Sequence, residues 1–196
     1  RIPIRYDRND NYFDDPFQAI PKNGYTDIFK KLLKNSDVVL KTKFDQIKDK
    51  VEYKYLVYTG KIDEFFNYKY GNLPYRSLKI KFENYNKNKY QKYVQVNYPN
   101  EHKYTRIVEI KHVTKQKIGK TTISKEYPTW DGEPYYPVPN PKNQLLYSKY
   151  LDLTLKTPHT FFIGRLAQYK YLNMDQVILE SLNLARKINK RIITSE

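Results

Sequence analysis

The sequence contains no cysteine and few histidines or glycines. Of its 196 residues, three are His and six are Gly. The absence of cysteine excludes disulfides, thiolate metal sites and a cysteine nucleophile. The histidines are scattered, at His102, His112 and His159, so we predict no metal site. The glycines are all isolated, so the sequence shows no glycine-rich phosphate loop and no dinucleotide-binding fingerprint.

Long apolar runs are also missing. The longest apolar runs, such as Phe161–Ile163, are far shorter than the roughly 20 residues that span a membrane. No secretory signal is present at the amino end. We therefore predict a cytoplasmic protein without a membrane span. The chain begins at Arg1 rather than Met, which we interpret as the start of a fragment.

Positive charge is abundant, with 36 Lys and Arg against 21 Asp and Glu and a formal net charge of +15. Such an excess favours an anionic partner, either nucleic acid or an anionic substrate. It is equally explained by a general bias in composition, because lysine occurs in nearly every segment. The segment 84–93 interleaves three lysines with three tyrosines, a pattern that suits single-stranded nucleic acid. A nucleic-acid-binding domain is therefore the alternative function.

Helical periodicity is clear in three places. A helix is predicted after Gly24, with an apolar face from Tyr25 to Leu33, and another over Leu145–Leu155. Asn173 and Gln176 match a capping box, which predicts that the last helix begins near Asn173. The expected inner face of that helix consists of Met174, Val177, Ile178, Ser181, Leu182, Ala185 and Ile188.

The middle of the chain changes to a period of two, which predicts an antiparallel sheet with one wet face. Hairpin turns are predicted at Asn84–Lys89 and Lys115–Lys120, and a short helix within Ile62–Tyr70. The first of four alternating runs begins at Arg76. The other three cover Val94–Tyr98, Tyr104–Val113 and Thr121–Tyr127. Continuous apolar runs predict strands buried on both faces at Val38–Leu40, Tyr55–Tyr58 and Thr160–Ile163. The predicted class is α+β.

Six runs of residues, in order along the chain, resemble the UDP-galactopyranose mutase family. Co-linear motifs over almost the whole chain make this resemblance specific. The runs are Arg1–Arg5 with Asn11–Phe13, Tyr58–Asp63, Asn72–Leu78, Lys103–Ile107, Glu133–Pro137 and Gly164–Asp175.

The resemblance implies a flavoenzyme, an isomerase that interconverts UDP-galactopyranose and UDP-galactofuranose for surface glycans of the cell envelope. In the family, reduced FAD acts through its N5 atom as a nucleophile toward the sugar, UDP leaves, and the adduct opens and recloses. The protein then supplies positioning and charge. Because the half with the phosphate-binding fingerprint is missing, we expect this chain alone to bind no FAD and to be inactive.

Residue roles are carried over from the family motifs. Arg1 and Arg106 resemble the two arginines that grip the diphosphate and stabilise the leaving group. Asn173 stands where many members carry Asp and cannot ionise, which puts an acid–base role there in doubt. Substrate-binding positions are Tyr12, Asn97, Tyr136 and Tyr171. Cofactor-binding positions are Arg165, Asn173, Met174 and Asp175.

The resemblance also implies a division of the chain. Residues 1–23 would be the rest of a mobile substrate loop, and residues 63–139 the antiparallel-sheet substrate domain. Residues 24–62 and 140–196 would be parts of a discontinuous FAD-binding domain. The implied partners are UDP-galactose and the missing amino-terminal half, with a homodimer as a further possibility.

Overall fold

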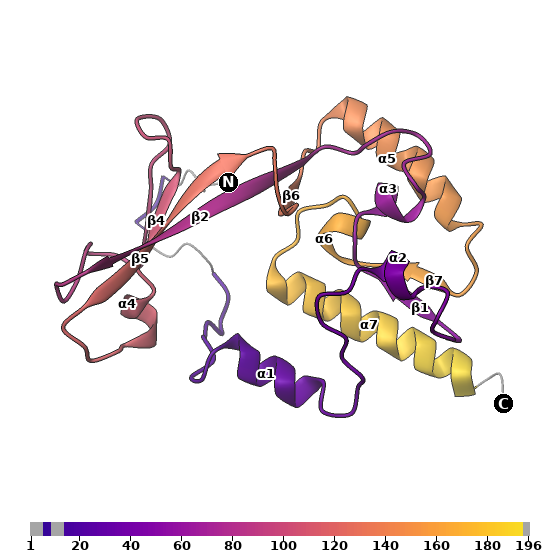
Figure 1. The fold of residues 1–196 in the computed structure, drawn as a ribbon, viewed down its shortest axis with the longest axis horizontal. Helices are drawn as coiled ribbons and strands as arrows, with labels where there is room; N and C mark the ends of the chain where they lie inside the picture. The colour runs from indigo at the N-terminus through magenta and orange to yellow at the C-terminus, as the bar shows by residue number, and fades with distance from the viewer. Residues whose placement is uncertain (1–5, 9–13, 194–196) are drawn as a thin grey trace.

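The computed structural model describes residues 6–8 and 14–193. An antiparallel sheet lies at one end of the molecule, and a small parallel sheet with most of the helices lies at the other (Figure 1). Helices are α1 Tyr25–Leu32, α2 Phe44–Ile47, α3 Ile62–Phe65, α4 Lys111–Thr114, α5 Pro141–Thr154, α6 Gly164–Ala167 and α7 Met174–Ile193. Strands are β1 Leu56–Tyr58, β2 Tyr75–Tyr85, β3 Gln95–Asn97, β4 Arg106–Val108, β5 Thr121–Thr129, β6 Tyr136–Pro137 and β7 Thr160–Phe162.

The larger sheet has the order β3-β4-β5-β2-β6 among the described residues, and every pairing in it is antiparallel. Its long strand β2 runs from the helical end of the molecule into the sheet (Figure 1). Together with the separate parallel pair, this confirms the α+β class. The alternating runs form the strands because one face packs on buried residues such as Ile107 and Ile123 while the other stays wet.

Two details of the predicted sheet are wrong. The strand predicted over Tyr104–Val113 ends at Val108, because the Glu109 side chain turns inward to accept hydrogen bonds and α4 then begins at Lys111. Asn84–Lys89 does not join two paired strands, since β2 pairs with β5 and β3 pairs with β4. Alternation identifies strands but not which strands pair.

The smaller sheet pairs β1 with β7 in parallel, with Tyr58 opposite Phe162. An aromatic core joins it to α3, β2 and α5. Its tyrosine hydroxyls are hydrogen-bonded: Tyr150 donates to the Gly71 carbonyl at 2.7 Å, and Tyr169 to the Pro74 carbonyl at 2.7 Å. Buried tyrosine is stable only when its hydroxyl finds such a partner. The buried members of the core are Ile62, Leu73, Tyr75, Tyr150 and Tyr169.

Helix starts follow the sequence signals. The Asn140 side chain accepts a hydrogen bond from the Asn143 amide at 2.9 Å, which caps α5 ahead of Pro141. The Asn173 amide donates to the Gln176 side chain at 2.8 Å, and α7 begins at Met174, which confirms the predicted start. None of the described helices is long and apolar enough to cross a membrane.

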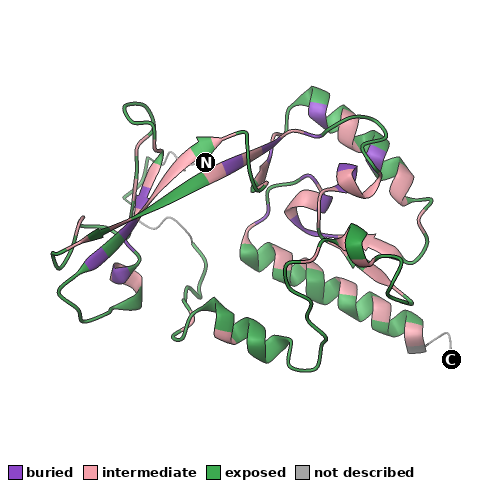
Figure 2. Cartoon of the chain, viewed as in Figure 1, coloured by how far each residue is buried: buried purple, intermediate pink, exposed green. Residues whose placement is uncertain are grey.

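Several apolar segments predicted to be buried are exposed. Val38–Leu40 forms no strand and all three side chains are more than half exposed, and Val57 of β1 is 43% exposed. Figure 2 shows α1 and α7 largely in the colour of exposed residues. On α7 the predicted inner-face residues Met174, Ile178 and Leu182 are exposed, whereas Val177 and Ile188 are partly buried.

Candidate functional site

Three predicted site residues meet where β6 contacts α6. The rings of Tyr136 and Tyr171 are stacked, with centroids 5.9 Å apart. The guanidinium carbon of Arg165 lies 4.5 Å from the Tyr171 ring centroid and 5.4 Å from that of Tyr136. Its Nε donates to the Leu172 carbonyl at 2.5 Å, which fixes the side chain. The cluster is a cation held against two aromatic rings beside the start of α7.

The other three predicted cofactor-binding residues, Asn173, Met174 and Asp175, follow at the amino end of α7. Asn173 is partly buried, and Met174 and Asp175 are exposed. Unpaired amides at the start of a 20-residue helix favour negative charge nearby. Arg165 and the start of α7 together place positive charge where an anionic group can bind.

Two further predicted residues, Asn97 and Arg106, form a second cluster in the sheet. They are directly opposite each other on β3 and β4, and Arg106 Nε donates to the Asn97 Oδ1 at 3.3 Å. On the other side, Arg106 Nη1 lies 3.5 Å from the Glu126 carboxylate on β5. Asn97 and Arg106 were predicted as site residues from the sequence, whereas Glu126 was not.

The strand register places both clusters on one face of the sheet. Glu126 is opposite both Arg106 and Ile80, and Tyr136 is opposite Arg76. Directly opposed residues share a face, and so do Arg76 and Ile80, four apart on β2. The clusters are four residues, about 13 Å, apart along β2, and β6 and β4 are three strands, about 14 Å, apart across the sheet because β2 and β5 lie between them. The two clusters therefore lie on one face of the sheet, apart from each other both along the strands and across them.

Arg1 and Tyr12 lie outside the described residues, so their predicted roles stay predictions.

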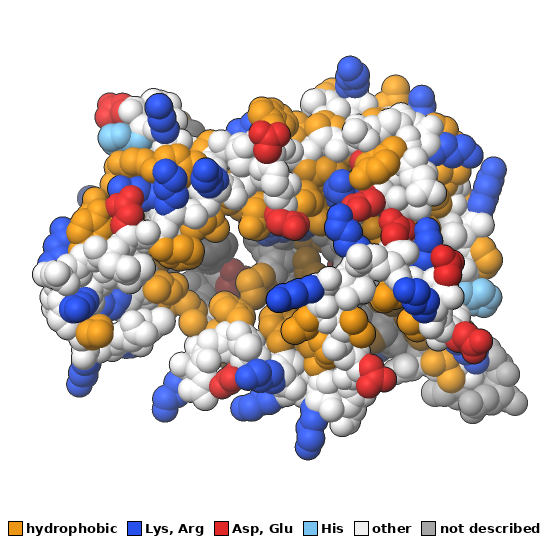
Figure 3. All heavy atoms as spheres, in the orientation of Figure 1, with side chains coloured by type: hydrophobic (Ala, Val, Ile, Leu, Met, Phe, Trp, Pro, Cys, Tyr) orange, Lys and Arg blue, Asp and Glu red, His pale blue; other side chains and the backbone are white. Residues whose placement is uncertain are grey.

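Figure 3 shows the molecule hollowed near its centre, between the sheet and the helical end.

A cavity of about 640 Å³ lies at the carboxyl end of β1, and the family-like runs converge on it. Tyr58–Lys61, Glu133–Pro134 and Leu166 all line it. Ligands of open α/β sheets bind at the carboxyl ends of strands, and this cavity lies at such an end. The Asp63 carboxylate joins two of the runs by accepting from the Leu73 amide at 2.9 Å. Burial raises the pKa of Asp63. Burial, and after it the nearby acidic groups Glu64 and Asp45, raises the pKa of Tyr58 to about 12.

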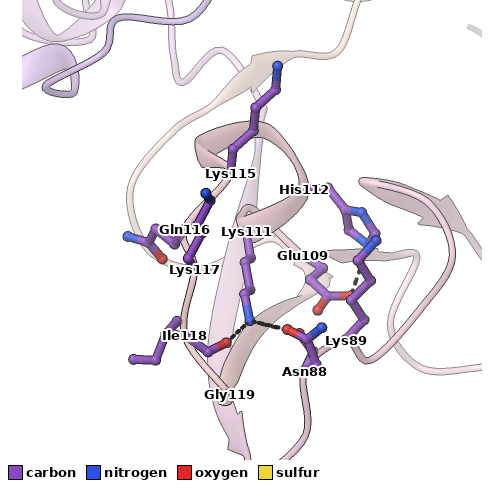
Figure 4. A pocket seen from close by; sticks show the side chains of 10 residues that line it. All are labelled: Asn88, Lys89, Glu109, Lys111, His112, Lys115, Gln116, Lys117, Ile118 and Gly119. Atoms are coloured by element: carbon purple, nitrogen blue, oxygen red, sulfur yellow. Dashed lines mark hydrogen bonds and ion pairs between the residues drawn. The ribbon is translucent and has the colours of Figure 1, made fainter.

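A separate pocket of about 470 Å³ lies beside α4, just beyond the end of β4, and none of the predicted site residues lines it (Figure 4). The Lys111 ammonium in it donates to the Asn88 carbonyl, the Asn88 side chain, and the carbonyls of Ile118 and Lys120. Figure 4 shows the Lys111 side chain directed at Asn88 and Ile118. Its three protons are fully used, so Lys111 anchors two loops and is not available to a ligand.

Glu109, in the same pocket, is buried and accepts hydrogen bonds from the Tyr90 and Gln91 amides and from Thr121. The His112 ring nitrogen lies 3.2 Å from it. Burial alone would raise the pKa of Glu109, but these hydrogen bonds and the His112 charge hold that pKa below its ordinary value. This is a structural carboxylate rather than a catalytic one.

Sequence reasoning also missed the pairing of Arg76 with Trp130. The Arg76 guanidinium lies 4.1 Å from the Trp130 ring centroid, beside the loop that leads to Tyr136. The signal available was the lone tryptophan of the chain, followed by Gly132 in a loop. This contact fixes the strand end that positions Tyr136.

Comparison with known proteins identifies the family. The family model for UDP-galactopyranose mutase matches residues 1–171. The chain belongs to the UDP-galactopyranose mutase family.

Individual mutases agree with this membership. The chain is 36% identical over 209 residues to a UDP-galactopyranose mutase of Mycoplasma genitalium and 32% identical over 209 residues to one of Mycoplasma pneumoniae. It is 33% identical over 198 residues to a dTDP-fucopyranose mutase of Escherichia coli. These alignments cover 95–96% of this chain and 52% of each relative. The chain thus spans about half the length of the curated relatives it matches.

Mutase membership disfavours the nucleic-acid alternative. The structure also shows how the Tyr–Lys segment is used. Lys87 lies 4.4 Å from the Tyr90 ring centroid and 5.3 Å from that of Tyr85, and the two rings contact each other. The tyrosine faces are therefore occupied within the sheet by lysine and by one another.

Proposed function

We propose that the protein interconverts the pyranose and furanose forms of a nucleotide sugar, with UDP-galactose as the substrate. The observation that carries this proposal is that predicted substrate residues of a mutase meet in two clusters on one face of the sheet. Family membership supports the reaction class. The product furanose would supply galactofuranose-containing glycans.

Arg106 would bind the diphosphate. As the bond from sugar to UDP breaks, negative charge gathers on the diphosphate, and a guanidinium placed there stabilises that charge. A guanidinium also forms paired hydrogen bonds with phosphate oxygens, which an ammonium does not. Tyr136 and Tyr171 would contribute hydroxyl contacts at the other end of the ligand, and Asn97 a contact on the sugar side. Arg1 and Tyr12 would complete this set.

Arg165 and the amino end of α7 would hold FAD. The donor set fits an anionic ring system: Arg165 is fixed by Leu172, and the start of a long helix lies beside it. Bound reduced flavin would supply the nucleophile for the sugar. Arg165 and the start of α7 would stabilise its negative charge, while Tyr136 and Tyr171 exclude water from the same side. We expect the 196-residue chain alone to bind no FAD tightly, because its sequence has no glycine-rich phosphate loop.

The apolar faces of α1 and α7 would contact the remaining half of the mutase fold. Phe29, Leu32, Leu179 and Leu182 are each more than half exposed. Parallel strands such as β1 and β7 are normally covered on both faces and belong to larger sheets. In this arrangement residues 24–62 and 140–196 are parts of the FAD-binding domain and residues 63–139 are the substrate domain. A homodimer of the whole protein stays a prediction.

The direct test uses the full-length protein, reduced with dithionite and supplied with UDP-galactofuranose. Chromatography of the products should show UDP-galactopyranose. Arg106→Ala should lower kcat/KM about 10–150-fold, because one charge-assisted contact to the diphosphate is lost. Arg106→Lys should recover only part of this, since a point charge replaces a fork.

Lys81→Ala is the matched control, because Lys81 is an exposed cation on the other face of the sheet. Its kcat/KM should be unchanged. Equal effects of the Arg106 and Lys81 variants would contradict a specific role for Arg106. A parallel assay with dTDP-fucofuranose tests the substrate, because one relative is a dTDP-fucopyranose mutase. A higher kcat/KM for dTDP-fucofuranose would replace UDP-galactose as the assigned substrate.

A further inference from the structure

We propose that Glu126 is a positioning residue that holds the Arg106 guanidinium ready for the diphosphate. The inference rests on the proposed function, because it assigns a role to the residue beside the diphosphate-binding arginine. Glu126 lies on β5, directly opposite Arg106 on β4. It therefore acts through Arg106 rather than on the substrate.

The sheet register aligns three side chains in a row. Asn97, Arg106 and Glu126 are consecutive partners across β3, β4 and β5, so their side chains lie on one face. Arg106 Nε is held at 3.3 Å by Asn97, and Arg106 Nη1 lies 3.5 Å from Glu126. Arg106 is thus held from both sides by residues on rigid strands.

A guanidinium is planar and carries its donors in a fixed geometry. Contacts at Nε and Nη1 therefore fix the plane of the whole group. Among the described residues, no partner contacts the remaining nitrogen, Nη2. Its two N–H donors remain for phosphate oxygens. Holding the group in this orientation before binding removes the entropy cost of ordering a long side chain on the ligand.

Folding stability does not account for this pair. The Arg106 side chain is 35% exposed and its nearest atom lies 3.5 Å from the Glu126 carboxylate, and such long ion pairs with a partly exposed member contribute little to stability. The Glu126 side chain is 16% exposed and its charge opposes an incoming diphosphate. A carboxylate at this position weakens the local positive potential, so its benefit lies in the orientation of Arg106. This separates a positioning role from simple attraction of an anion.

A double-mutant cycle on the full-length, reduced protein tests the inference. The variants are Glu126→Ala, Arg106→Ala and the double variant, each assayed for kcat/KM with UDP-galactofuranose and for Tm. Glu126→Ala should lower kcat/KM about 3–20-fold in the wild-type background and less than about 2-fold in the Arg106→Ala background. A residue that acts through Arg106 has nothing left to position once Arg106 is gone.

Conservative and control variants sharpen the result. Glu126→Gln keeps an acceptor of the same length, so it should recover part of the lost kcat/KM, and it carries the same cycle if the alanine variant does not fold. Glu83→Ala removes a similar ion pair, Glu83 to Lys125 at 2.8 Å, on the opposite face of the sheet. Its kcat/KM should match the wild type.

The outcomes separate the two proposals. Equal factors for Glu126→Ala with and without Arg106, or no loss at all, would overturn the positioning role. The same holds if Glu126→Ala only lowers Tm. A wild-type protein that binds FAD but converts neither nucleotide sugar would overturn the proposed function, and the inference with it. An active wild type with an additive cycle would overturn the inference alone.

Discussion

The two ends of the molecule differ in the kind of side chain that they bury. In the antiparallel sheet, the fully buried side chains include a carboxylate, Glu109, whose oxygens are satisfied by neighbouring loops. At the helical end, the buried centre is formed by tyrosines such as Tyr150 and Tyr169. Large apolar side chains are exposed at both ends, such as Phe82 on β2 and Leu179 on α7, but α1 and α7 are exposed along most of their length (Figure 2).

The difference indicates which end is self-contained. Around α4, polar groups bind one another, and the loops close on the sheet without help from other chains. Around β1 and β7, a two-stranded parallel sheet and the apolar faces of α1 and α7 stay open. Since apolar patches of this kind mark contact surfaces, the helical end has the character of part of a larger unit. Four predictions test this contrast.

The largest effect is expected at Glu109. Glu109→Ala leaves the Tyr90 and Gln91 amides and the Thr121 hydroxyl without their acceptor inside the sheet. Removing one side of such a buried network costs about 3–5 kcal/mol. Hydrogen exchange of the full-length protein should show lost protection in β4 and β5 and little change in α5. Glu101→Ala, at an exposed position between β3 and β4, is the control. Equal loss of protection at both ends of the molecule would show that the sheet is not self-contained.

Low pH should lower the stability of the sheet end before that of the helical end. The loss should be smaller than the loss caused by Glu109→Ala. The pKa of Glu109 in the folded protein lies below its ordinary value of about 4.3, so the unfolded state binds the proton more tightly. The stabilisation is therefore present above the unfolded pKa and is lost as pH falls through the folded pKa. Thermal unfolding between pH 7 and pH 3 should show a steeper fall for the wild type than for Glu109→Gln. Parallel profiles would contradict this role.

Sequence patterns predicted local structure better than they predicted which distant residues contact each other. The Asn173–Gln176 cap and the alternation of β2 and β5 are signals between near neighbours, and both were predicted. The end of β4 was not, because it depends on Glu109 contacting loop residues 18–19 positions away. Val38–Leu40 looked like a buried strand, but nothing among the described residues covers it.

The candidate site shows the same limit. Family motifs named Arg165, Tyr136 and Tyr171 separately, and only the structure shows that their side chains contact one another. Periodicity placed Asn97 and Arg106 on strands, but only the register shows that they are opposite each other and that Glu126 completes the row. Long-range register depends on which strands pair, and a single sequence carries little information on that choice.

At the helical end, Tyr150→Phe should cost about 1–3 kcal/mol of stability. The Tyr150 hydroxyl donates to the Gly71 carbonyl and accepts from the Tyr70 amide at 3.0 Å, and both lose that partner. Hydrogen exchange should show the loss in α5 and β1 but not in β4. Tyr53→Phe, at an exposed tyrosine, should leave protection unchanged. Loss of protection that reached β4 equally would mean that the two ends unfold as one unit.

The smallest effect in the isolated chain is expected for Leu179→Ser on α7. Leu179 is 58% exposed there, so the substitution should change the stability of the 196-residue chain by less than about 0.5 kcal/mol. In the full-length protein the same substitution should cost about 1.5–3 kcal/mol, because a leucine covered by the rest of the fold loses its burial. Leu155→Ser, at the end of α5 and 83% exposed, should have a small effect in both. Chemical denaturation of both lengths measures the difference between them. If Leu179→Ser has the same small effect in both lengths, the exposed face of α7 stays in water in the whole protein. The open helical end would then be a property of this family member rather than a contact surface.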